Sequence, residues 1–329
     1  MYRDLTMKEI SEQQIGQTLQ MAGWVENIRD HGGVSFIDLR DMYGVLQMVI
    51  RKPELLKGIT KEMCLSITGL MEHRDEETYN PKIPSGTIEL EAHKIDVLGR
   101  VYKQLPFEIQ TSKEIREDVR LKYRYLDLRR PDLQRNLRMK SQVMTLTRQF
   151  FSDEGFLEVE TPMLGKTTPE GARDYLVPSR IHPGSFYGLP QSPQLYKQLL
   201  MCSGVDRYIQ IARCFRDEDL RADRQPEFTQ IDMELSFVDV DDVIEVNEKY
   251  LKKLFKEVLD VDVQLPIQRM TWQEAMNRYG SDKPDLRFGM ELKDVSDVVK
   301  GCGFASFTRR LVAVCGISSL KMGIKRPVS

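Results

Sequence analysis

The stretch FRDEDLRADRQPEFTQID, residues 215–232, decides how the middle of the chain folds. On either side of its charged centre, residues 208–215 and 228–237 alternate apolar and polar side chains, which predicts two β-strands. The segment between them is too long and too polar for a tight hairpin turn. A solvated hairpin with weak surface ion pairs is the ordinary interpretation of such a loop. Its dense mixture of arginines and carboxylates favours a binding site instead.

Several side chains in this stretch have the chemistry of a nucleotide site. Arg216 can hold a phosphate through a fork of donors, Phe228 can stack on a purine, and Glu218 can accept from an amino group. The wording of the stretch resembles motif 2 of the class II aminoacyl-tRNA synthetases, and within them the bacterial-type aspartyl-tRNA synthetases. The resemblance implies that Arg216 is catalytic and that ATP is bound by Arg216, Glu218, Gln225 and Phe228.

Composition sets the bounds of the prediction. The 329 residues are enough for two domains, and a net charge of −2 excludes a strongly basic nucleic-acid coat while leaving room for local basic stripes. Cysteines and histidines are scattered, so we expect no disulfide framework and no metal bound by the chain's own residues. Because no apolar signal core or membrane-length run occurs, we expect a cytoplasmic protein with no membrane partner.

Residues 1–100 are predicted to form a small β domain. The candidate strands cover residues 18–28, 35–41, 44–50, 65–71 and 87–98, and the segment 53–63 between the third and fourth has helical character. Five strands with a helix after the third is the element order of an OB-fold, a barrel that binds oligonucleotides on its open face.

Four residues on that barrel are candidates for RNA contact. Phe36 can stack an unpaired base, and Arg29 and Gln47 can hydrogen-bond base edges. The alternative is that Phe36 and Trp24 simply fill the barrel, because both alternate with polar neighbours. The run GWVENIRDHGGVSFIDLRD resembles the anticodon-binding domain of the aspartyl-tRNA synthetases, which implies tRNA contacts for Arg29, Phe36, Gln47 and Glu89.

Residues 101–131 are predicted to be a hinge, interpreted either as a solvated linker or, by resemblance, as a segment that touches tRNA. A helix is then expected from Asp132, as its cap, to Asp153, followed by a stop at Gly155 and a strand ending at Pro162. This order resembles motif 1 of the class II enzymes, which implies that Pro162 lies in a homodimer interface.

The remaining candidates lie around the amino-acid pocket that the resemblance implies. Residues 167–175 form a polar loop with a glycine hinge, interpreted either as a mobile surface loop or as a lid. Lys197, in the first turn of a helix predicted over 194–202, can neutralise a substrate carboxylate, and Asp232 needs a partner in its apolar strand. By resemblance the aspartate-binding residues are Glu170, Ser192, Gln194, Lys197, Gln230 and Asp232.

The reaction implied is aspartate–tRNA ligation. The α-carboxylate of aspartate attacks the α-phosphate of ATP, and the aspartyl group then passes to the 3′ end of tRNA-Asp, or also of tRNA-Asn. Catalysis is expected from positioning and from charge neutralisation by Arg216 and Mg²⁺, without a side-chain nucleophile. The expected partners are tRNA-Asp, L-aspartate, ATP and a second copy of the chain, with no DNA.

The resemblance runs to about residue 305. The tail, residues 306–329, lacks the pattern of the family's motif 3, the carboxylates that hold catalytic Mg²⁺ and the arginine that recognises the aspartate side chain. We therefore expect a chain truncated before motif 3, with a tail out of register with the family, as after a frameshift or an early stop.

The predicted fold is α+β, with an OB barrel at 1–100, a hinge at 101–131 and a partial class II catalytic domain at 132–305 built on an antiparallel sheet. One alternative function is an inactive, dimerising tRNA-binding fragment, because motif 3 is not recognisable. Another is a synthetase for asparagine or lysine, which the aspartyl-type wording disfavours. RNA binding without enzyme ancestry leaves residues 215–232 unexplained.

Overall fold

The computed structural model describes residues 1–168, 170–294 and 316–318. The chain divides into two compact units, one made of Met1–Cys202 with Arg207–Glu234 and the other of Ser203–Asp206 with Leu235–Ser329. The domain boundaries predicted at residues 100, 131 and 305 stay a prediction. Of the predicted tail, only Gly316–Ser318 lies within the described residues.

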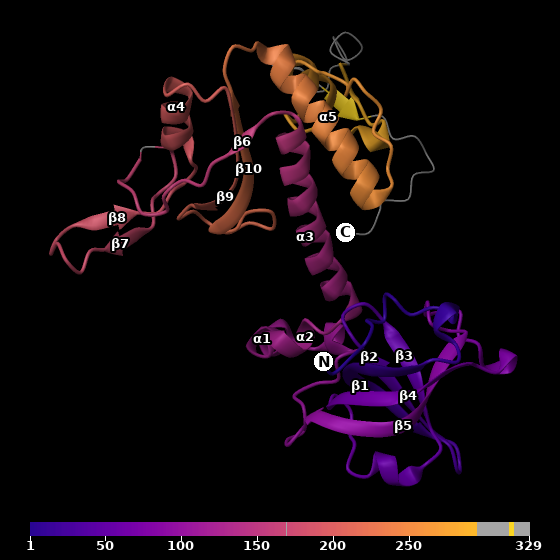
Figure 1. Cartoon of the computed structure of the whole chain (residues 1–329). Helices are drawn as coiled ribbons and strands as arrows, with labels where there is room; N and C mark the ends of the chain where they lie inside the picture. The colour runs from indigo at the N-terminus through magenta and orange to yellow at the C-terminus, as the bar shows by residue number, and fades with distance from the viewer. Residues whose placement is uncertain (169, 295–315, 319–329) are drawn as a thin grey trace, which may run out of the picture. The chain divides into compact units, whose positions relative to one another are not determined.

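The first unit begins with a closed five-stranded barrel (Figure 1). Its strands follow the order β1-β2-β3-β5-β4, and only β3 and β5 pair in parallel. The bounds are β1 Thr18–Asp30, β2 Ser35–Arg40, β3 Val45–Ile50, β4 Cys64–His73 and β5 Ile88–Gly99, with short 3-10 turns at Glu12–Gln14 and Glu76–Thr78. The predicted OB-type barrel is therefore confirmed.

The barrel forms because one side chain in two along each strand is apolar and points inward. Met21, Val25, Ile37 and Leu39 are fully buried in one continuous core. Gly69 allows two strands to approach, since a Cβ there would lie 2.0 Å from the carbonyl oxygen of Glu91. Burial of this core is the main stabilising contribution to the barrel.

The helix suggested between the third and fourth strands is wrong in extent. Only the single 3-10 turn η2, Pro53–Leu56, forms there. Gly58 and Glu62 both have positive φ angles, +76° and +62°, which no right-handed helix tolerates. The helical character of the sequence is local, and the positive φ angles at Gly58 and Glu62 prevent a longer helix.

The segment after the barrel is ordered rather than an open linker. It contains the 3-10 turn η4, Ser112–Glu114, and two short helices, α1 Glu117–Lys122 and α2 Arg124–Asp127. A small apolar core of Phe107, Ile109 and Leu126 holds it together. The segment therefore has local structure although most of its side chains are exposed, and its role as a hinge that touches tRNA stays a prediction.

The long helix α3 spans Pro131–Asp153, close to the prediction. Its cap is not Asp132, because proline occupies the first helical position and Arg130 is the N-cap. Asp132 instead accepts hydrogen bonds from the guanidinium of Arg130 at 2.6 and 2.8 Å. Gly155, with a φ of +79°, follows the helix end as expected.

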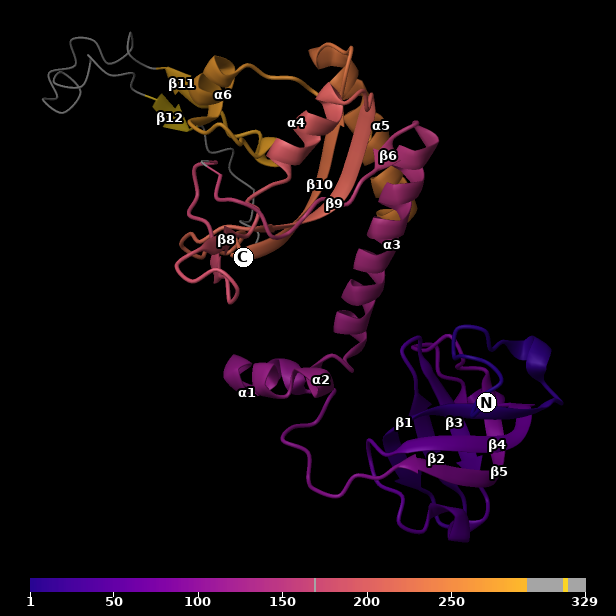
Figure 2. The same ribbon diagram turned by 60° about the vertical axis from the view of Figure 1, so that its left-hand side comes forward.

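A second sheet, of three strands, has the order β10-β9-β6 (Figure 2). The strands β9, Arg207–Phe215, and β10, Glu227–Leu235, are the two predicted from the charged stretch. The strand expected to end at Pro162 is shorter, β6 Leu157–Glu158, and pairs with β9 in parallel. Around it lie helix α4, Gln194–Cys202, as predicted, and the hairpin β7 Leu176–Pro178 with β8 Phe186–Gly188.

The second unit contains α5 Val240–Leu259, α6 Trp272–Tyr279, the 3-10 turn η5 Leu286–Phe288, and the pair β11 Leu292–Asp294 with β12 Gly316–Ser318. The strand predicted to run to residue 237 ends at Leu235, because Phe237 adopts a positive φ of 57°. A capping box formed by Asp239 and Asp242 then starts α5.

Candidate functional site

Side chains on one face of the β9–β10 pair form the candidate catalytic site. The guanidinium of Arg216 lies 5.1 Å from the ring centre of Phe228, and Cys214 Sγ lies 3.3 Å from Gln230 Oε1. These two contacts show that β9 and β10 run in opposite directions. Since side chains alternate along a strand, every second residue of β10 belongs to this face. The residues concerned are Phe228, Gln230, Asp232 and Glu234.

A cavity of about 400 Å³ lies at the end of this face. Its lining includes all four candidates for ATP binding, namely Arg216, Glu218, Gln225 and Phe228. The cation–π contact holds the Arg216 side chain against the ring of Phe228. The structure therefore brings together a fixed positive charge, an aromatic ring and a carboxylate around one opening.

Lys197 of α4 is buried and joins the middle of the face. Its Nζ donates to Asp232 Oδ1 at 2.9 Å and pairs with Glu234 Oε2 at 3.2 Å. Burial disfavours the charged form of this lysine, but the two carboxylates outweigh burial and raise its pKa. Lys197 is therefore a cation held in place by two anions.

Asp232 keeps one acceptor free. Its Oδ2 atom is buried and receives no hydrogen bond within the described chain. Such an atom is costly unless a donor reaches it. Nearby, burial, the charge of Asp232 and a hydrogen-bonding interaction with its carboxylate raise the pKa of Tyr208, whose hydroxyl donates to Gln210 at 2.7 Å. With the tyrosine proton directed at Gln210, Asp232 Oδ2 can accept from a cationic ligand group.

The loop 167–175 is tied down by a residue to which the sequence assigned no role, Gln191. The side chain of Gln191 is almost wholly buried, accepts from Ala172 N at 3.1 Å and donates to Ala172 O at 3.0 Å. It also donates to Asp174, which in turn accepts from Thr168 N at 3.1 Å. Gln191 therefore anchors the C-terminal half of the loop.

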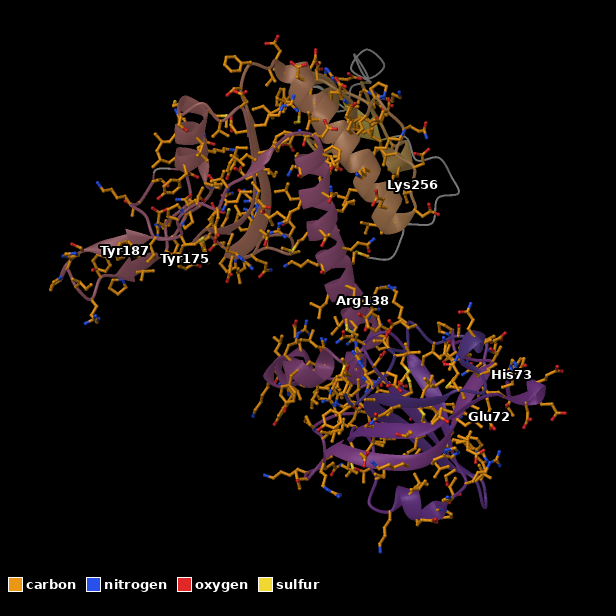
Figure 3. The ribbon with its side chains drawn as sticks, viewed as in Figure 1. Glu72, His73, Arg138, Tyr175, Tyr187 and Lys256 are labelled. Atoms are coloured by element: carbon orange, nitrogen blue, oxygen red, sulfur yellow. The ribbon has the colours of Figure 1, made fainter. Side chains whose placement is uncertain are left out.

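Glu170 lies at the exposed part of the same loop. Ser192 Oγ donates to Glu170 Oε2 at 2.6 Å and accepts from Gln194 N at 3.3 Å. Three of the predicted amino-acid residues are therefore linked in one chain of hydrogen bonds. Figure 3 marks Tyr175, where this loop passes into the β7–β8 hairpin, and Tyr187 on β8.

Pro162 is exposed and lines a small cavity of about 30 Å³ together with Glu170 and Ser192. This places it beside the loop, and its assignment to a dimer interface stays a prediction.

On the barrel, all four candidates for RNA contact lie together. Strand register sets Arg29 opposite Phe36 and Gln47 beside Glu89. Arg29 donates to Gln47 Oε1 at 2.9 Å, and Gln47 donates to Glu89 Oε2 at 2.7 Å. Burial raises the pKa of the Glu89 carboxyl, while the hydrogen bond from Gln47 and the charge of Arg74 oppose the rise.

Two further residues complete this barrel face and were missed from sequence. Asp38 accepts from Arg29 at 2.6 Å, and Arg74 donates to Gln47 Oε1 at 3.0 Å. Asp38 sits directly opposite Gln47 in the β2–β3 register, so the alternation of β2 was the signal that would have found it. Arg74 lies just beyond the end of β4, where no periodic pattern marks it.

Phe36 and Trp24 are not part of the barrel core. Phe36 is half-buried beside Arg29 and His31 on the outer face. Trp24 instead meets the hinge, with the guanidinium of Arg129 5.0 Å from its ring centre. The hypothesis that these aromatics fill the barrel is wrong, and Trp24 lies at the contact between barrel and hinge.

Within the described residues, no cluster of histidine, cysteine or carboxylate side chains is arranged to hold a metal ion. Among the helices of the same residues, none has the length and apolar character needed to cross a membrane.

Two family models match the chain. The model described as tRNA synthetases class II (D, K and N) covers residues 116–315, and the OB-fold nucleic acid binding domain covers residues 19–98. The chain belongs to the class II tRNA synthetases. The resemblance drawn from residues 215–232 is therefore confirmed, and the site on β9 and β10 lies within the matched synthetase region.

The relatives of this synthetase chain are named as aspartate–tRNA ligases. The chain is 58% identical to the aspartate–tRNA(Asp/Asn) ligase of Lachnoclostridium phytofermentans over 318 residues, covering 94% of this chain and 53% of that protein. Identity and coverage are the same for the aspartate–tRNA ligase of Agathobacter rectalis. The synthetase chain thus spans about half the length of the curated relatives that it matches.

A solved structure shares the fold of this synthetase chain. Asparaginyl-tRNA synthetase from Pyrococcus horikoshii, complexed with asparaginyl-adenylate, superposes with a TM-score of 0.74 at 22% identity. The match covers 90% of this chain and 71% of that one. At this identity the likeness shows the α+β fold and no more.

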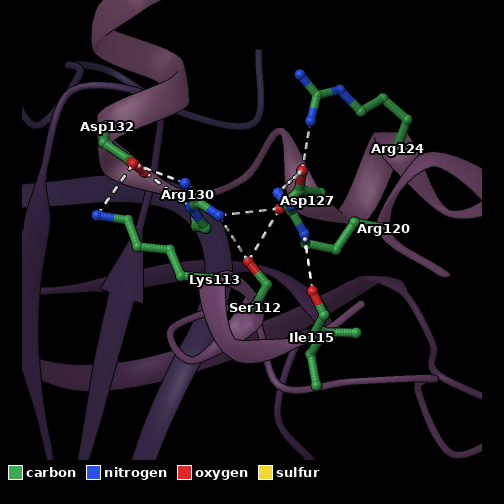
Figure 4. A network of polar contacts seen from close by, with 8 residues as sticks. All are labelled: Ser112, Lys113, Ile115, Arg120, Arg124, Asp127, Arg130 and Asp132. Atoms are coloured by element: carbon green, nitrogen blue, oxygen red, sulfur yellow. Dashed lines mark hydrogen bonds and ion pairs between the residues drawn. The ribbon is translucent and has the colours of Figure 1, made fainter. Parts of the chain in front are cut away.

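Residues 112–132 of the synthetase chain carry a polar network around the fully buried Asp127 (Figure 4). Asp127 accepts from Ser112 at 3.0 Å and from Arg124 at 2.5 Å, and it pairs with Arg130 at 3.3 Å. The hydrogen bond from Arg130 also holds the pKa of Asp132 well below its usual range. Part of the basic run at 122–130 is therefore used internally, and the surface that it leaves for RNA is smaller than its composition indicates.

Proposed function

We propose that this chain supplies the ATP-, aspartate- and anticodon-binding residues of an aspartate–tRNA ligase, which joins L-aspartate to the 3′ end of tRNA-Asp. The proposal rests mainly on the order of side chains along one face of β10. Phe228 lies beside a cavity with Arg216, Gln230 follows, and then Asp232 with a free carboxylate oxygen. An aminoacyl-adenylate presents a base, a phosphate, an acyl group and an ammonium in the same sequence.

The nucleotide end of this proposal rests on Arg216 and Phe228. The ring can stack on adenine, and the guanidinium beside it can hold the α-phosphate without losing its charge. Glu218 and Gln225 line the same cavity and can bond the edge of the base. A half-buried guanidinium directed at a phosphate stabilises the charge that develops during attack on phosphorus.

The amino-acid end rests on Lys197 and Asp232. Asp232 Oδ2 is a buried acceptor that suits the substrate's α-ammonium group. Lys197 is already paired with Asp232 and Glu234, so we propose that the side-chain carboxylate of aspartate takes the place of Glu234 on its ammonium. The side chain of lysine would be repelled there, and the neutral amide of asparagine would gain less. Among the D, K and N synthetases, this charge favours aspartate. Glu170, Ser192, Gln194 and Gln230 are the further contacts that we propose around the amino acid.

The chemistry then needs no nucleophilic side chain. An oxygen of the α-carboxylate attacks the α-phosphorus of ATP, a P–O bond forms, and pyrophosphate leaves. The 3′ hydroxyl of the tRNA next attacks the acyl carbon and gives up its proton, the bond between the acyl carbon and the bridging oxygen breaks, and AMP leaves with the P–O bond that formed in the first step. The contribution of the chain is to align these groups, which alone lowers the barrier substantially.

The barrel supplies the RNA-binding half of the proposal. Phe36 offers a ring for an unstacked anticodon base, and Arg29, Gln47 and Glu89 offer donors and acceptors held in fixed directions by one another.

We further propose that tRNA-Asn is a second substrate to be tested beside tRNA-Asp, that the chain works in the cytoplasm, and that Pro162 lies in a homodimer interface.

Mg²⁺ enters the proposal only as the ion that accompanies the phosphates of ATP and shields their charge. The described residues do not form a carboxylate cluster that fits it. No step of the mechanism above is therefore assigned to metal ligands of this chain.

Calorimetric titration of the 329-residue chain tests the proposal. The probes are non-hydrolysable sulfamoyl analogues of aspartyl-, asparaginyl- and lysyl-adenylate. The aspartyl analogue should bind at least tenfold more tightly than the other two, and Lys197→Met should remove that preference under conditions in which hydrogen exchange shows β9 and β10 still folded. Equal or tighter binding of the lysyl analogue would rule out an aspartate site. Arg148→Ala, an exposed arginine on α3, is the matched control and should change none of the affinities.

A second candidate is a tRNA-binding and dimerising protein without catalysis. The observation behind it is that the barrel is closed and that its proposed RNA face is held together by hydrogen bonds independently of the β9–β10 site. Aspartate-dependent exchange of pyrophosphate into ATP separates the two candidates. Exchange means that the chain activates aspartate, and tRNA binding without exchange means that it only binds.

A further inference from the structure

A buried thiol lies inside the proposed site and has no part in the mechanism above. Cys214 is completely buried on β9, on the face that carries the site. Its Sγ lies 3.3 Å from Oε1 of Gln230 on the facing strand. The only other acceptor recorded for it among the described residues is the carbonyl oxygen of Ala212, at 4.0 Å.

The proton of this thiol has one favourable acceptor. Burial raises the pKa of Cys214 to about 11, so the group stays protonated across the physiological range. A protonated thiol is a weak hydrogen-bond donor, and of the two acceptors Gln230 Oε1 is nearer by 0.7 Å, the difference of the two distances.

The thiol of Cys214 fixes the orientation of the Gln230 side-chain amide. With Oε1 turned to the thiol, the NH₂ group points away from Cys214. The flipped amide turns an N–H group to the sulfur, which is only a weak acceptor, and loses the S–H···O bond. Without the thiol proton this preference disappears, and the amide divides its population between two orientations.

We propose that Cys214 is a positioning residue, whose thiol donates to Gln230 Oε1 and directs the Gln230 amide nitrogen at the acyl group of bound aspartyl-adenylate. Gln230 lies between Phe228 and Asp232 on one face of β10, and each step of two residues along a strand covers about 6.7 Å. The group that meets Gln230 therefore lies between the base and the α-ammonium. In aspartyl-adenylate this group is the acyl carbonyl, an acceptor that the NH₂ group can bond.

The inference rests on the proposed function, and the experiment separates the two. Calorimetry measures binding of ATP and of the sulfamoyl analogue of aspartyl-adenylate to the full chain, to Cys214→Ala and to Cys214→Ser. Cys214→Ala should bind the analogue about 3- to 10-fold more weakly, the cost of one misdirected hydrogen bond, and should bind ATP within twofold of the unaltered chain. Cys214→Ser keeps a donor and should recover most of the loss.

A double-mutant cycle with Gln230→Ala shows whether Cys214 acts through that residue. The double variant should bind the analogue no more weakly than Gln230→Ala alone, whereas a purely structural role predicts additive losses. Cys64→Ala, which removes a half-buried thiol on β4 of the barrel, is the matched control and should leave both affinities unchanged.

The outcomes are distinct. If the unaltered chain does not bind the analogue, the proposed function fails and takes this inference with it. If the chain binds it and Cys214→Ala binds it equally well, or loses ATP affinity by the same factor, the positioning role alone is overturned. Additive losses in the cycle overturn it as well.

Discussion

The barrel face and the β9–β10 face both carry the residues proposed to bind ligands, but they are prepared differently. On the barrel, Arg29, Gln47 and Glu89 hold one another through hydrogen bonds of 2.9 and 2.7 Å. On the β9–β10 face, Asp232 keeps an unpartnered oxygen beside an open cavity lined by Arg216. The barrel candidates hold one another in place, although Arg74 Nε on the same face also lacks a hydrogen-bond partner, whereas on the β9–β10 face the unpartnered atom is a carboxylate oxygen.

The two regions also differ in how they are stabilised. The barrel has a continuous core in which residues such as Met21, Ile67 and Leu90 have almost no exposure. The β6–β9–β10 sheet rests on fewer buried groups, among them the ring pairs of Phe151 with Phe150 and Phe156. We therefore expect changes of charge to lower stability more in this sheet than in the barrel.

The largest expected effect comes from removing the cation at the centre of the catalytic face. Lys197→Met leaves two neighbouring carboxylates without their partner and should destabilise the β9–β10 region by about 3–5 kcal/mol. Hydrogen exchange resolved by region should show faster exchange in β9 and β10 and unchanged exchange in the barrel.

Lys140→Met, an exposed lysine of α3, is the control for the loss of a lysine charge. Adding Asp232→Asn to Lys197→Met should recover part of the protection. Uniform loss of protection across the barrel would contradict the separation between the regions.

The next effect distinguishes packing from binding within the barrel. Ile37→Ala removes a fully buried side chain and should cost about 2–5 kcal/mol of stability. Phe36→Ala, its neighbour on the outer face, should leave the melting temperature within a few degrees. It should instead weaken binding of the tRNA-Asp anticodon stem-loop by about 1–3 kcal/mol, the usual loss of one stacked base. Thermal unfolding measures the stability, and fluorescence anisotropy measures the affinity for the stem-loop. A large loss of stability in Phe36→Ala would mean that this ring packs in the core.

A smaller effect is expected at the nucleotide end of the catalytic face. Arg216→Ala should weaken ATP binding by about 1.5–3 kcal/mol, which is roughly 10- to 150-fold, because it removes a charged donor to phosphate. The barrel's affinity for RNA should not change. Titration with ATP measures this affinity, with Arg148→Ala as the control. If Arg216→Ala binds ATP as tightly as the unaltered chain, Arg216 makes no phosphate contact.

The smallest effect is a pH dependence confined to the barrel. Glu26 has a buried oxygen without a hydrogen bond, and burial raises its pKa in the folded state although Arg40 opposes the rise. A raised folded-state pKa contributes stability below the unfolded value of 4.5 that is lost as the pH rises through the folded value. Glu26→Gln should therefore be relatively most stable near pH 7 and lose this advantage toward pH 4, as denaturant titrations at the two pH values would show. The same stability difference at both values would contradict it.

Alternation along strands is what made the sequence informative. It located β9 and β10, put Phe228 and Asp232 on one strand, and placed Arg29 and Phe36 on the barrel. Each of these depends on neighbours within a few residues, which a single sequence displays. The helix at 194–202 was found for the same reason, and its bounds are those of α4.

What the sequence did not show depends on contacts across long separations. The pairing of Lys197 with Asp232 joins residues 35 apart, and Gln191 reaches Ala172 over 19. The cap predicted at Asp132 is wrong, because the Asp132 carboxylate accepts a hydrogen bond from Arg130, which also pairs with Asp127. Gln47 was predicted as a base-reading residue, but its bonds to Arg74 and Glu89 appear only when the barrel closes.

The anchoring of Ala172 limits how far Glu170 can travel. Thr168 and Ala172 are both fixed, through Asp174 and Gln191, and each stands two residues from Glu170 along the chain. Two residues of extended chain span at most about 7 Å, so the Cα of Glu170 moves on a short tether with Gly171, at a φ of +100°, as its pivot. A ligand that contacts Glu170 must therefore bind close to the loop, because the chain between Thr168 and Ala172 is too short for Glu170 to move far toward it.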